Sequence, residues 1–138
     1  MPTETAEPQT VPRPASTPTS TTTRAPATRI AVELVPRSRS ALLAELGEVR
    51  ALGSVQTVNI PDLLRFSMRS WDGCAVASTA VPHTVPHIRA IDIDPRKPLP
   101  MAGALIEAGI TEVLVIEGDP PADMGHRTYS VTSLEIIR

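Results

Sequence analysis

The feature that most constrains the fold of this chain is a regular alternation of strand-like and helix-like segments after residue 28. Short runs rich in aliphatic residues begin near positions 29, 55, 85 and 112, so successive runs start 26, 30 and 27 residues apart. Alternation of strand and helix at this interval predicts parallel βα units. A complete (β/α)8 barrel takes about 250 residues, or ~31 per unit. Residues 29–138 therefore supply about four units, which predicts an α/β fold of half a TIM-type barrel or a small open sheet.

The expected elements follow from periodicity and from residues that stop regular structure. Strands are expected at residues 29–36, 55–60, 87–93 and 112–117, helices at 38–53, 63–76 and 100–108, and a final helix or strand at 131–137. The first helix has apolar residues at helical spacing: Leu42, Leu46 and Val49. Ser38 or Ser40 is expected to cap its start, and Gly53 is expected to end it. The third strand is expected to begin only after Pro86, because proline cannot donate to a sheet.

Residues 1–28 have a composition that does not support a folded core. They contain nine Thr and six Pro but no Leu, Ile, Phe, Tyr or Trp. Such a segment buries too little apolar surface to offset its ordering, so a disordered tail is expected at 1–28 and a folded domain at 29–138. The tail weakly resembles an organelle transit peptide, but it has no amphipathic period, and the cytoplasm is the expected compartment.

Composition and spacing exclude several classes of function. A net charge of −2, with scattered Arg and a single Lys (Lys97), argues against a nucleic-acid partner. No apolar run approaches the ~18 residues of a membrane span. Cys74 is the only cysteine, which excludes an intrachain disulfide. His83 and His87 are four residues apart, but the prolines around them disfavour a helix and no further ligand completes a metal site.

Three segments in order carry a resemblance to a known family. They are residues 31–36, with an acid in the first strand; 86–92, where Pro-His leads to Asp; and 114–121, a strand ending in Gly-Asp-Pro-Pro and followed by Thr-Tyr-Ser at 128–130. Together they resemble the N-terminal half of the methylenetetrahydrofolate reductase family. Those enzymes are flavin-dependent (β/α)8 barrels of one-carbon metabolism.

The resemblance implies a role for each matching residue. Glu33 matches the general acid that protonates N10 of the folate, and Asp119 matches the carboxylate that lies near the flavin and the folate. The implied flavin contacts are Asn59, His87, Gly118, Asp119, Tyr129 and Ser130. The implied cofactors are FAD and NADH or NADPH as electron donor, and the implied reaction reduces 5,10-methylenetetrahydrofolate to 5-methyltetrahydrofolate.

Other interpretations of these residues remain open from the sequence. Glu33 also fits a strand-end glutamate that faces water, Asp119 a carboxylate that caps its own turn, and His87 a structural histidine. Glu117 departs from the family, which usually has Arg or a neutral residue there; an inward-pointing acid would repel a flavin diphosphate. The family's second half, which supplies the rest of its FAD and folate sites, has no counterpart in these residues.

Three further polar residues lie near the ends of the expected strands. Asp92 and Asp94 alternate with isoleucines, so both are expected on one side of a strand. Paired carboxylates there suggest acid/base catalysis, but a position at the barrel mouth or an Asx turn explains them equally well. His126 lies in a Gly- and Pro-rich loop and is expected to be solvent exposed.

A second hypothesis belongs to another class of function, a non-catalytic or split-subunit interaction protein. Four strands of an eight-stranded barrel leave two unpaired edges and an uncovered apolar face. Such a unit is expected to pair with another chain or with a second copy of itself, so a homo-oligomer or a partner subunit is predicted.

Overall fold

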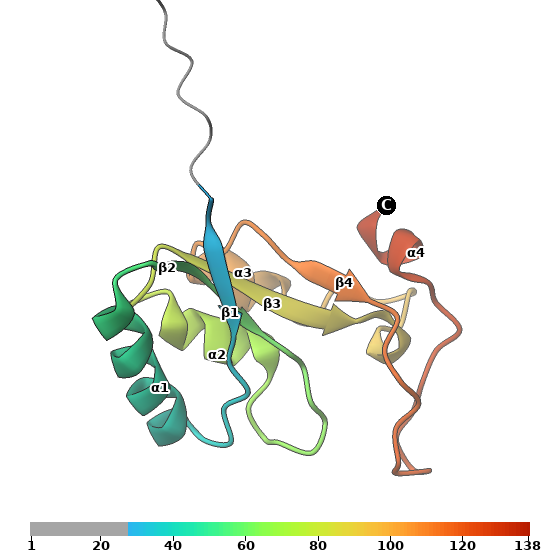
Figure 1. The fold of residues 1–138 in the computed structure, drawn as a ribbon. Helices are drawn as coiled ribbons and strands as arrows, with labels where there is room; N and C mark the ends of the chain where they lie inside the picture. The colour runs from blue at the N-terminus through green and yellow to red at the C-terminus, as the bar shows by residue number, and fades with distance from the viewer. Residues whose placement is uncertain (1–27) are drawn as a thin grey trace, which may run out of the picture.

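The computed structural model describes residues 28–138, in which strands and helices alternate (Figure 1). The tail expected at 1–28 lies outside these residues, except for Thr28. The elements are β1 (Ile30–Glu33), α1 (Arg39–Leu52), β2 (Val55–Ile60), α2 (Ser70–Ala77), β3 (His83–Arg89), the 3₁₀ turn η1 (Ala90–Asp92), α3 (Ala102–Glu107), β4 (Leu114–Ile116) and α4 (Ser133–Ile137). The last segment is thus a helix, one of the two forms expected for it.

The described strands form one four-stranded sheet in the order β1-β2-β3-β4, and every neighbouring pair is parallel. Sequential order with a helical connection after each strand is the pattern of consecutive units of a βα barrel. The sheet is curled, so that β1 crosses the direction of β3 in Figure 1. The expected α/β fold of parallel βα units is therefore confirmed.

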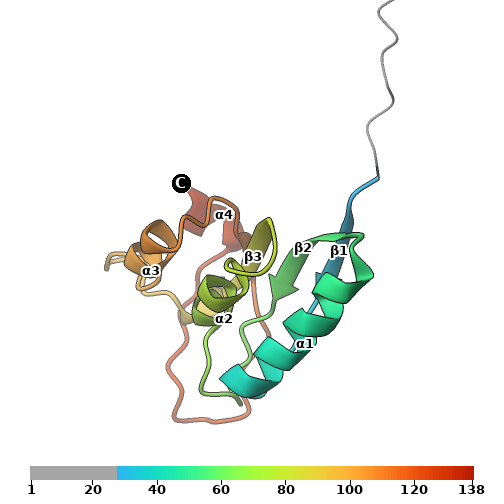
Figure 2. The same cartoon turned by 90° about the vertical axis from the view of Figure 1, so that its left-hand side faces the viewer.

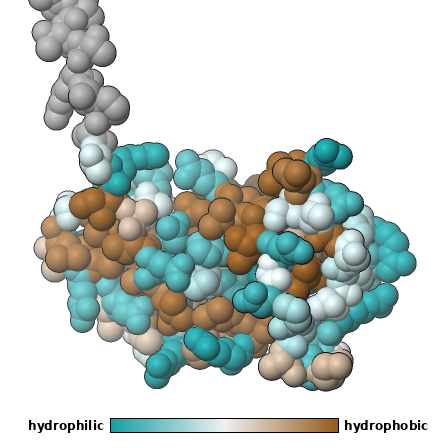
Figure 3. All heavy atoms as spheres, turned by 45° about the vertical axis from the view of Figure 1, so that its right-hand side comes forward, coloured by the Kyte–Doolittle hydropathy of each residue, from teal (hydrophilic) through white to brown (hydrophobic). Residues whose placement is uncertain are grey.

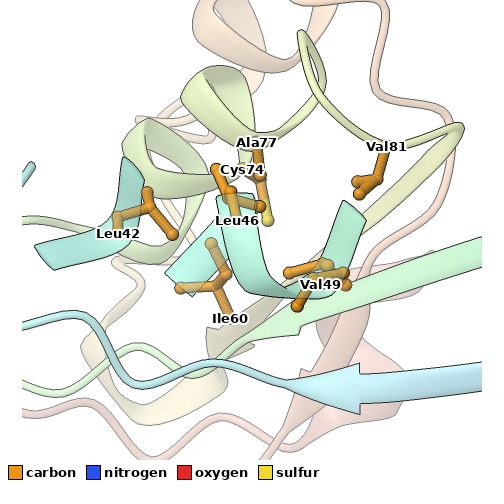
Figure 4. Packing of buried hydrophobic residues seen from close by; sticks show 8 residues of the cluster. Leu42, Leu46, Val49, Ile60, Cys74, Ala77 and Val81 are labelled. Carbon is orange, nitrogen blue, oxygen red and sulfur yellow. The ribbon is translucent and has the colours of Figure 1, made fainter. Parts of the chain in front are cut away.

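Helix α1 begins and ends where the sequence predicts. The Ser38 Oγ accepts a 3.2 Å hydrogen bond from the Ala41 N–H, and Gly53 ends the helix with a φ of 66°. Leu42, Leu46 and Val49 are buried. With residues from β2, α2 and the turn before β3, they form the larger core cluster, much of which Figure 4 shows: Leu42, Leu46, Val49, Val58, Ile60, Cys74, Ala77 and Val81.

A smaller cluster lies under β3 and β4. Ile88, Ile93 and Met101 form its buried part, with partly buried residues from three helices and β4 around them: Trp71, Leu105, Val115 and Ile136. Residues of all four helices thus pack against the same side of the sheet, as the turned view of Figure 2 shows for α1, α2 and α3. Within residues 28–138 no helix has the length and hydropathy needed to cross a bilayer.

The second helix begins later than expected. The pattern predicted a helix over 63–76, but residues 61–69 form a loop and α2 starts at Ser70. The physical reason is a cap from outside the helix: the buried Asp62 carboxylate accepts a 3.2 Å hydrogen bond from the Ser70 N–H. This cap fixes the first turn of α2 at Ser70.

The third strand also differs from the expectation. It begins at His83 and includes Pro86, and it ends at Arg89. Pro86 pairs with Ile60, the last residue of β2, and pairing with β4 starts only at His87. Proline is tolerated there because it stands where one ladder ends and the other begins, so its missing N–H interrupts neither ladder.

Candidate functional site

Three of the predicted site residues lie on the side of the sheet that faces away from the helices. Glu33 stands between Val32 and Leu34, which pack against the helical core. Because side chains alternate along a strand, Glu33 points to the opposite face. By the same alternation, Asn59 on β2 and His87 and Arg89 on β3 point to this face, with Val85 as the register partner of Asn59. We call the face defined by Glu33, Asn59, His87 and Arg89 the open face.

Glu33 and Asn59 are direct neighbours on adjacent strands. They are register partners in the β1–β2 pairing, and the Leu34 N–H donates a 2.9 Å hydrogen bond to the Asn59 carbonyl. Glu33 is exposed and Asn59 is half-buried. The backbone pairing therefore fixes a solvent-exposed carboxyl beside a half-buried amide.

His87 is the most unusual polar residue of the open face. The residue is only 8% exposed, and its Nε2 atom has no hydrogen-bond partner among the described residues. Its backbone carbonyl accepts a 2.6 Å hydrogen bond from the Ser70 hydroxyl, which ties β3 to the start of α2. Buried polar atoms are rarely left without a partner, so an unsatisfied nitrogen at this position requires an explanation.

Gly118 and Asp119 lie against Arg89, at the carboxyl end of the sheet. Gly118 has a φ of 92°, and a Cβ built there would stand 3.2 Å from the Arg89 Cβ. The Arg89 Nη2 donates a 2.7 Å hydrogen bond to the Asp119 carbonyl. These residues line a cavity of about 450 Å³ together with Asp62 and Glu117. Parallel α/β proteins bind ligands at this end of the strands.

A buried carboxylate holds this end of β3 in place. The Asp92 side chain is 7% exposed; its Oδ2 accepts a 2.8 Å hydrogen bond from the Arg89 Nε, and its Oδ1 lies 3.0 Å from the His126 Nε2. Asp92 belongs to η1 and Asp94 follows it, bound to Arg96, so the expectation that both point to one side of a strand is wrong. The chain leaves the strand at Arg89 and forms the 3₁₀ turn η1, and this turn brings the Asp92 carboxylate within hydrogen-bond distance of Arg89.

His126, expected to be solvent exposed, is only partly exposed. Its side chain is 30% exposed and is bonded to Asp92, which precedes it by 34 residues. Sequence reasoning missed the group formed by Arg89, Asp92 and His126, because no local motif connects residues so far apart.

Tyr129 and Ser130 lie on the segment that returns from this loop. The Tyr129 N–H donates a 2.8 Å hydrogen bond to the Ile91 carbonyl, and the Arg127 guanidinium stands 5.1 Å from the centre of the Tyr129 ring. Ser130 is exposed. Neither residue lines the 450 Å³ cavity. The structure therefore brings Gly118 and Asp119 to the end of the open face and leaves Tyr129 and Ser130 outside that cavity.

The part of the chain that the structure describes holds no group of three or more His, Cys, Asp or Glu residues placed to bind a metal ion. Comparisons of the chain with protein-family models, with curated proteins and with solved structures find no match.

Proposed function

We propose that the chain is part of a flavin-dependent reductase that resembles methylenetetrahydrofolate reductase, built on the first half of a (β/α)8 barrel. The observation that carries the proposal is the buried, unpartnered Nε2 of His87 on the same face as Glu33 and Asn59. The resemblance assigns flavin contacts to His87 and Asn59 and proton donation to Glu33. Sequential parallel strands with their polar side chains on one face support that assignment.

The surroundings of His87 suit a flat ring with polar edges. Leu114, its register partner on β4, is 45% exposed on the open face, and Ile116 two residues later is 38% exposed. Exposed aliphatic side chains offer a surface for a flavin ring, while the His87 nitrogen and the Asn59 amide offer hydrogen bonds to its edge. FAD, when bound, supplies the hydride that it takes from NADH or NADPH.

The acids of the site have separate tasks in this proposal. Glu33 is the general acid for N10 of the folate, and its exposed position leaves the carboxyl accessible to substrate and to water. The Asp119 carboxylate orients the folate at the end of β4, where the bond from Arg89 to its carbonyl fixes the backbone. Glu117 lines the same cavity as Asp119, and its charge disfavours a diphosphate there. Glu117 therefore makes this cavity unsuitable for the diphosphate of FAD.

Flavin binding by the full chain tests the proposal. Titration with FAD, followed by quenching of flavin fluorescence, is expected to show weak binding that His87→Leu weakens by about tenfold, the worth of one buried hydrogen bond. His83→Leu is the matched control, since His83 lies on the same strand and face but is exposed. Equal affinities for the two variants would contradict the role of His87.

The proton donor requires a different measurement, made on a preparation with reductase activity. Glu33→Gln is expected to abolish folate reduction while sparing reduction of the flavin by NADH or NADPH. Glu48→Gln, on the exposed side of α1, is the control. Equal loss of both half-reactions would show that Glu33 maintains the structure or binds the flavin.

A specific observation favours a second candidate function, an interaction subunit that completes a barrel with a partner. Exposed aliphatic residues lie at both edges of the sheet. Ile30 is on β1, and the others are on or directly before β4: Val113, Leu114 and Ile116. Figure 3 shows hydrophobic residues across the middle of one face of the molecule, between hydrophilic regions. Co-purification with a second barrel half, or a dimer in solution without bound flavin, would favour this function.

A further inference from the structure

A second cavity also borders Arg89, and the resemblance assigns a role to none of its lining residues. It has a volume of about 600 Å³, within the range of small-molecule sites. The loop after β2 and the loop after β4 form its walls, and Arg89 at the end of β3 borders it. Three arginines and His126 line it, and Asp123 is the one acidic residue among the lining residues.

One arginine of this cavity, Arg69, is held in a fixed position. The Arg69 Nε donates a 2.9 Å hydrogen bond to the Asp62 Oδ1, its Nη2 is paired with Oδ2 of the same carboxylate, and its guanidinium stacks 4.5 Å from the centre of the Trp71 ring. Asp62 in turn is only 3% exposed and caps α2. Arg69 is therefore oriented before any ligand arrives, which lowers the entropy lost on binding.

The lining offers more hydrogen-bond donors than its own acceptors satisfy. A guanidinium carries five N–H donors, and the Nη1 atoms of Arg69 and Arg89 have no partner among residues 28–138. Arg65 has no carboxylate partner in this part of the chain and stands 4.9 Å from the Phe66 ring. The His126 Nε2 lies 3.0 Å from the Asp92 Oδ1, and a neutral ring that donates from Nε2 has only an acceptor at Nδ1, so the free donors of this lining belong to the arginines.

Leu63, Leu64, Pro120 and Pro121 supply an apolar wall beside these donors. Arg65 and Arg69 lie on the loop after β2 and Arg89 lies at the end of β3, so guanidinium groups from two elements border the cavity. A phosphate group presents three acceptor oxygens where a carboxylate presents two, so it can accept from more of these donors. We propose that this cavity binds the phosphate group of a small organic molecule with an apolar body, through the guanidinium groups of Arg65 and Arg69. This phosphate site is separate from the proposed flavin site, since neither His87 nor Asn59 lines the cavity.

Calorimetric titration of the full chain with phenyl phosphate tests the site. Arg65→Ala is expected to weaken binding by about tenfold, because it removes a charged hydrogen-bonding group from an exposed, unpaired position. Asp123→Asn is expected to tighten binding, because it removes the opposing charge while its amide oxygen still accepts from the Gly125 N–H. Arg50→Ala, exposed on α1, is the control for net charge and should leave the affinity unchanged.

Absence of phenyl phosphate binding at millimolar concentration, or equal affinities for Arg65→Ala and Arg50→Ala, would overturn the site. Benzoate has the same apolar body with a carboxylate; if it binds as tightly as phenyl phosphate, the assignment to phosphate is wrong. His87→Leu should leave the affinity for phenyl phosphate intact, so failure of the proposed flavin site and failure of this site are distinguishable.

Discussion

Arg89 donates a 2.7 Å hydrogen bond from its Nη2 to the backbone carbonyl of Asp119, thirty residues further along the chain. The same guanidinium donates from its Nε to the buried Asp92 carboxylate. One side chain at the end of β3 therefore fixes both the 3₁₀ turn that follows it and the loop that follows β4. The two cavities described above share this residue, so its loss should affect both.

Arg89→Met is expected to lower the free energy of unfolding by about 3 kcal/mol, because it leaves the Asp92 carboxylate buried without its cation. Urea denaturation measures the change. Arg96→Met is the control: the Arg96 side chain is 72% exposed, so its loss should change the free energy of unfolding far less. The double variant Arg89→Met with Asp92→Asn should recover part of the stability. Equal destabilisation by Arg89→Met and Arg96→Met would contradict the structural role of Arg89.

Gly118→Ala is expected to destabilise the chain by about 1–3 kcal/mol, because its φ of 92° is strained for an alanine and the added Cβ meets Arg89 at 3.2 Å. Gly47→Ala is the opposite case. Gly47 lies inside α1 with nothing within 4 Å of an added Cβ, so alanine should stabilise the helix by about 0.5–1 kcal/mol. Thermal melts of the two variants should move in opposite directions. A melting temperature unchanged by Gly118→Ala would show that this turn is not constrained.

His87→Leu is expected to keep or raise the stability of the chain while it weakens FAD binding. The unpartnered Nε2 of His87 contributes a desolvation cost that leucine does not have. Denaturant titration and FAD titration of the same preparation measure the two effects. Loss of stability together with unchanged FAD affinity would assign His87 to the structure alone.

The pKa of the Asp94 carboxyl is lowered from 3.8 to about 2, first by the side-chain hydrogen bonds of Arg96 and then by the Arg96 N–H. A carboxyl whose pKa is lower in the folded chain stabilises the fold above its unfolded pKa, and that contribution is lost as the pH falls. We therefore expect the Asp94 contribution to be complete above about pH 4 and to vanish toward about pH 2. A carboxyl-detected NMR titration measures the midpoint, which Arg96→Ala should return toward the ordinary value. A midpoint that does not respond to Arg96→Ala would show that Arg96 is not the cause of the lowered pKa.

Leu114→Lys is expected to reduce self-association of the chain. Leu114 is 45% exposed on a strand that has no neighbour on one side among the described residues, and a lysine on such a strand disfavours pairing with another chain. Light scattering after size-exclusion chromatography at micromolar concentration compares the variant with the parent chain and with Leu43→Lys, an exposed position on α1. A parent chain that is already a 14.7 kDa monomer would contradict the expectation.

The local sequence was sufficient for the fold class and for the best-defined elements. The spacing of aliphatic runs predicted parallel βα units, and Ser38 and Gly53 predicted the ends of α1, because caps and helical periodicity act within a few residues. The sequence also predicted that Gly118 and Asp119 follow β4 at the end of the sheet. The positions of Glu33, Asn59 and His87 on one face follow from strand alternation and register once the core side is known.

Tertiary structure alone decided the features that depend on distant partners. Asp62 moved the start of α2 to Ser70, and Pro86 lies inside β3 because one ladder ends where the other begins. His126 is bonded to Asp92, 34 residues away, where the sequence predicted contact with solvent. These outcomes depend on hydrogen bonds and ion pairs that exist only when the strands are in register, and no periodicity in the sequence encodes which distant groups will meet.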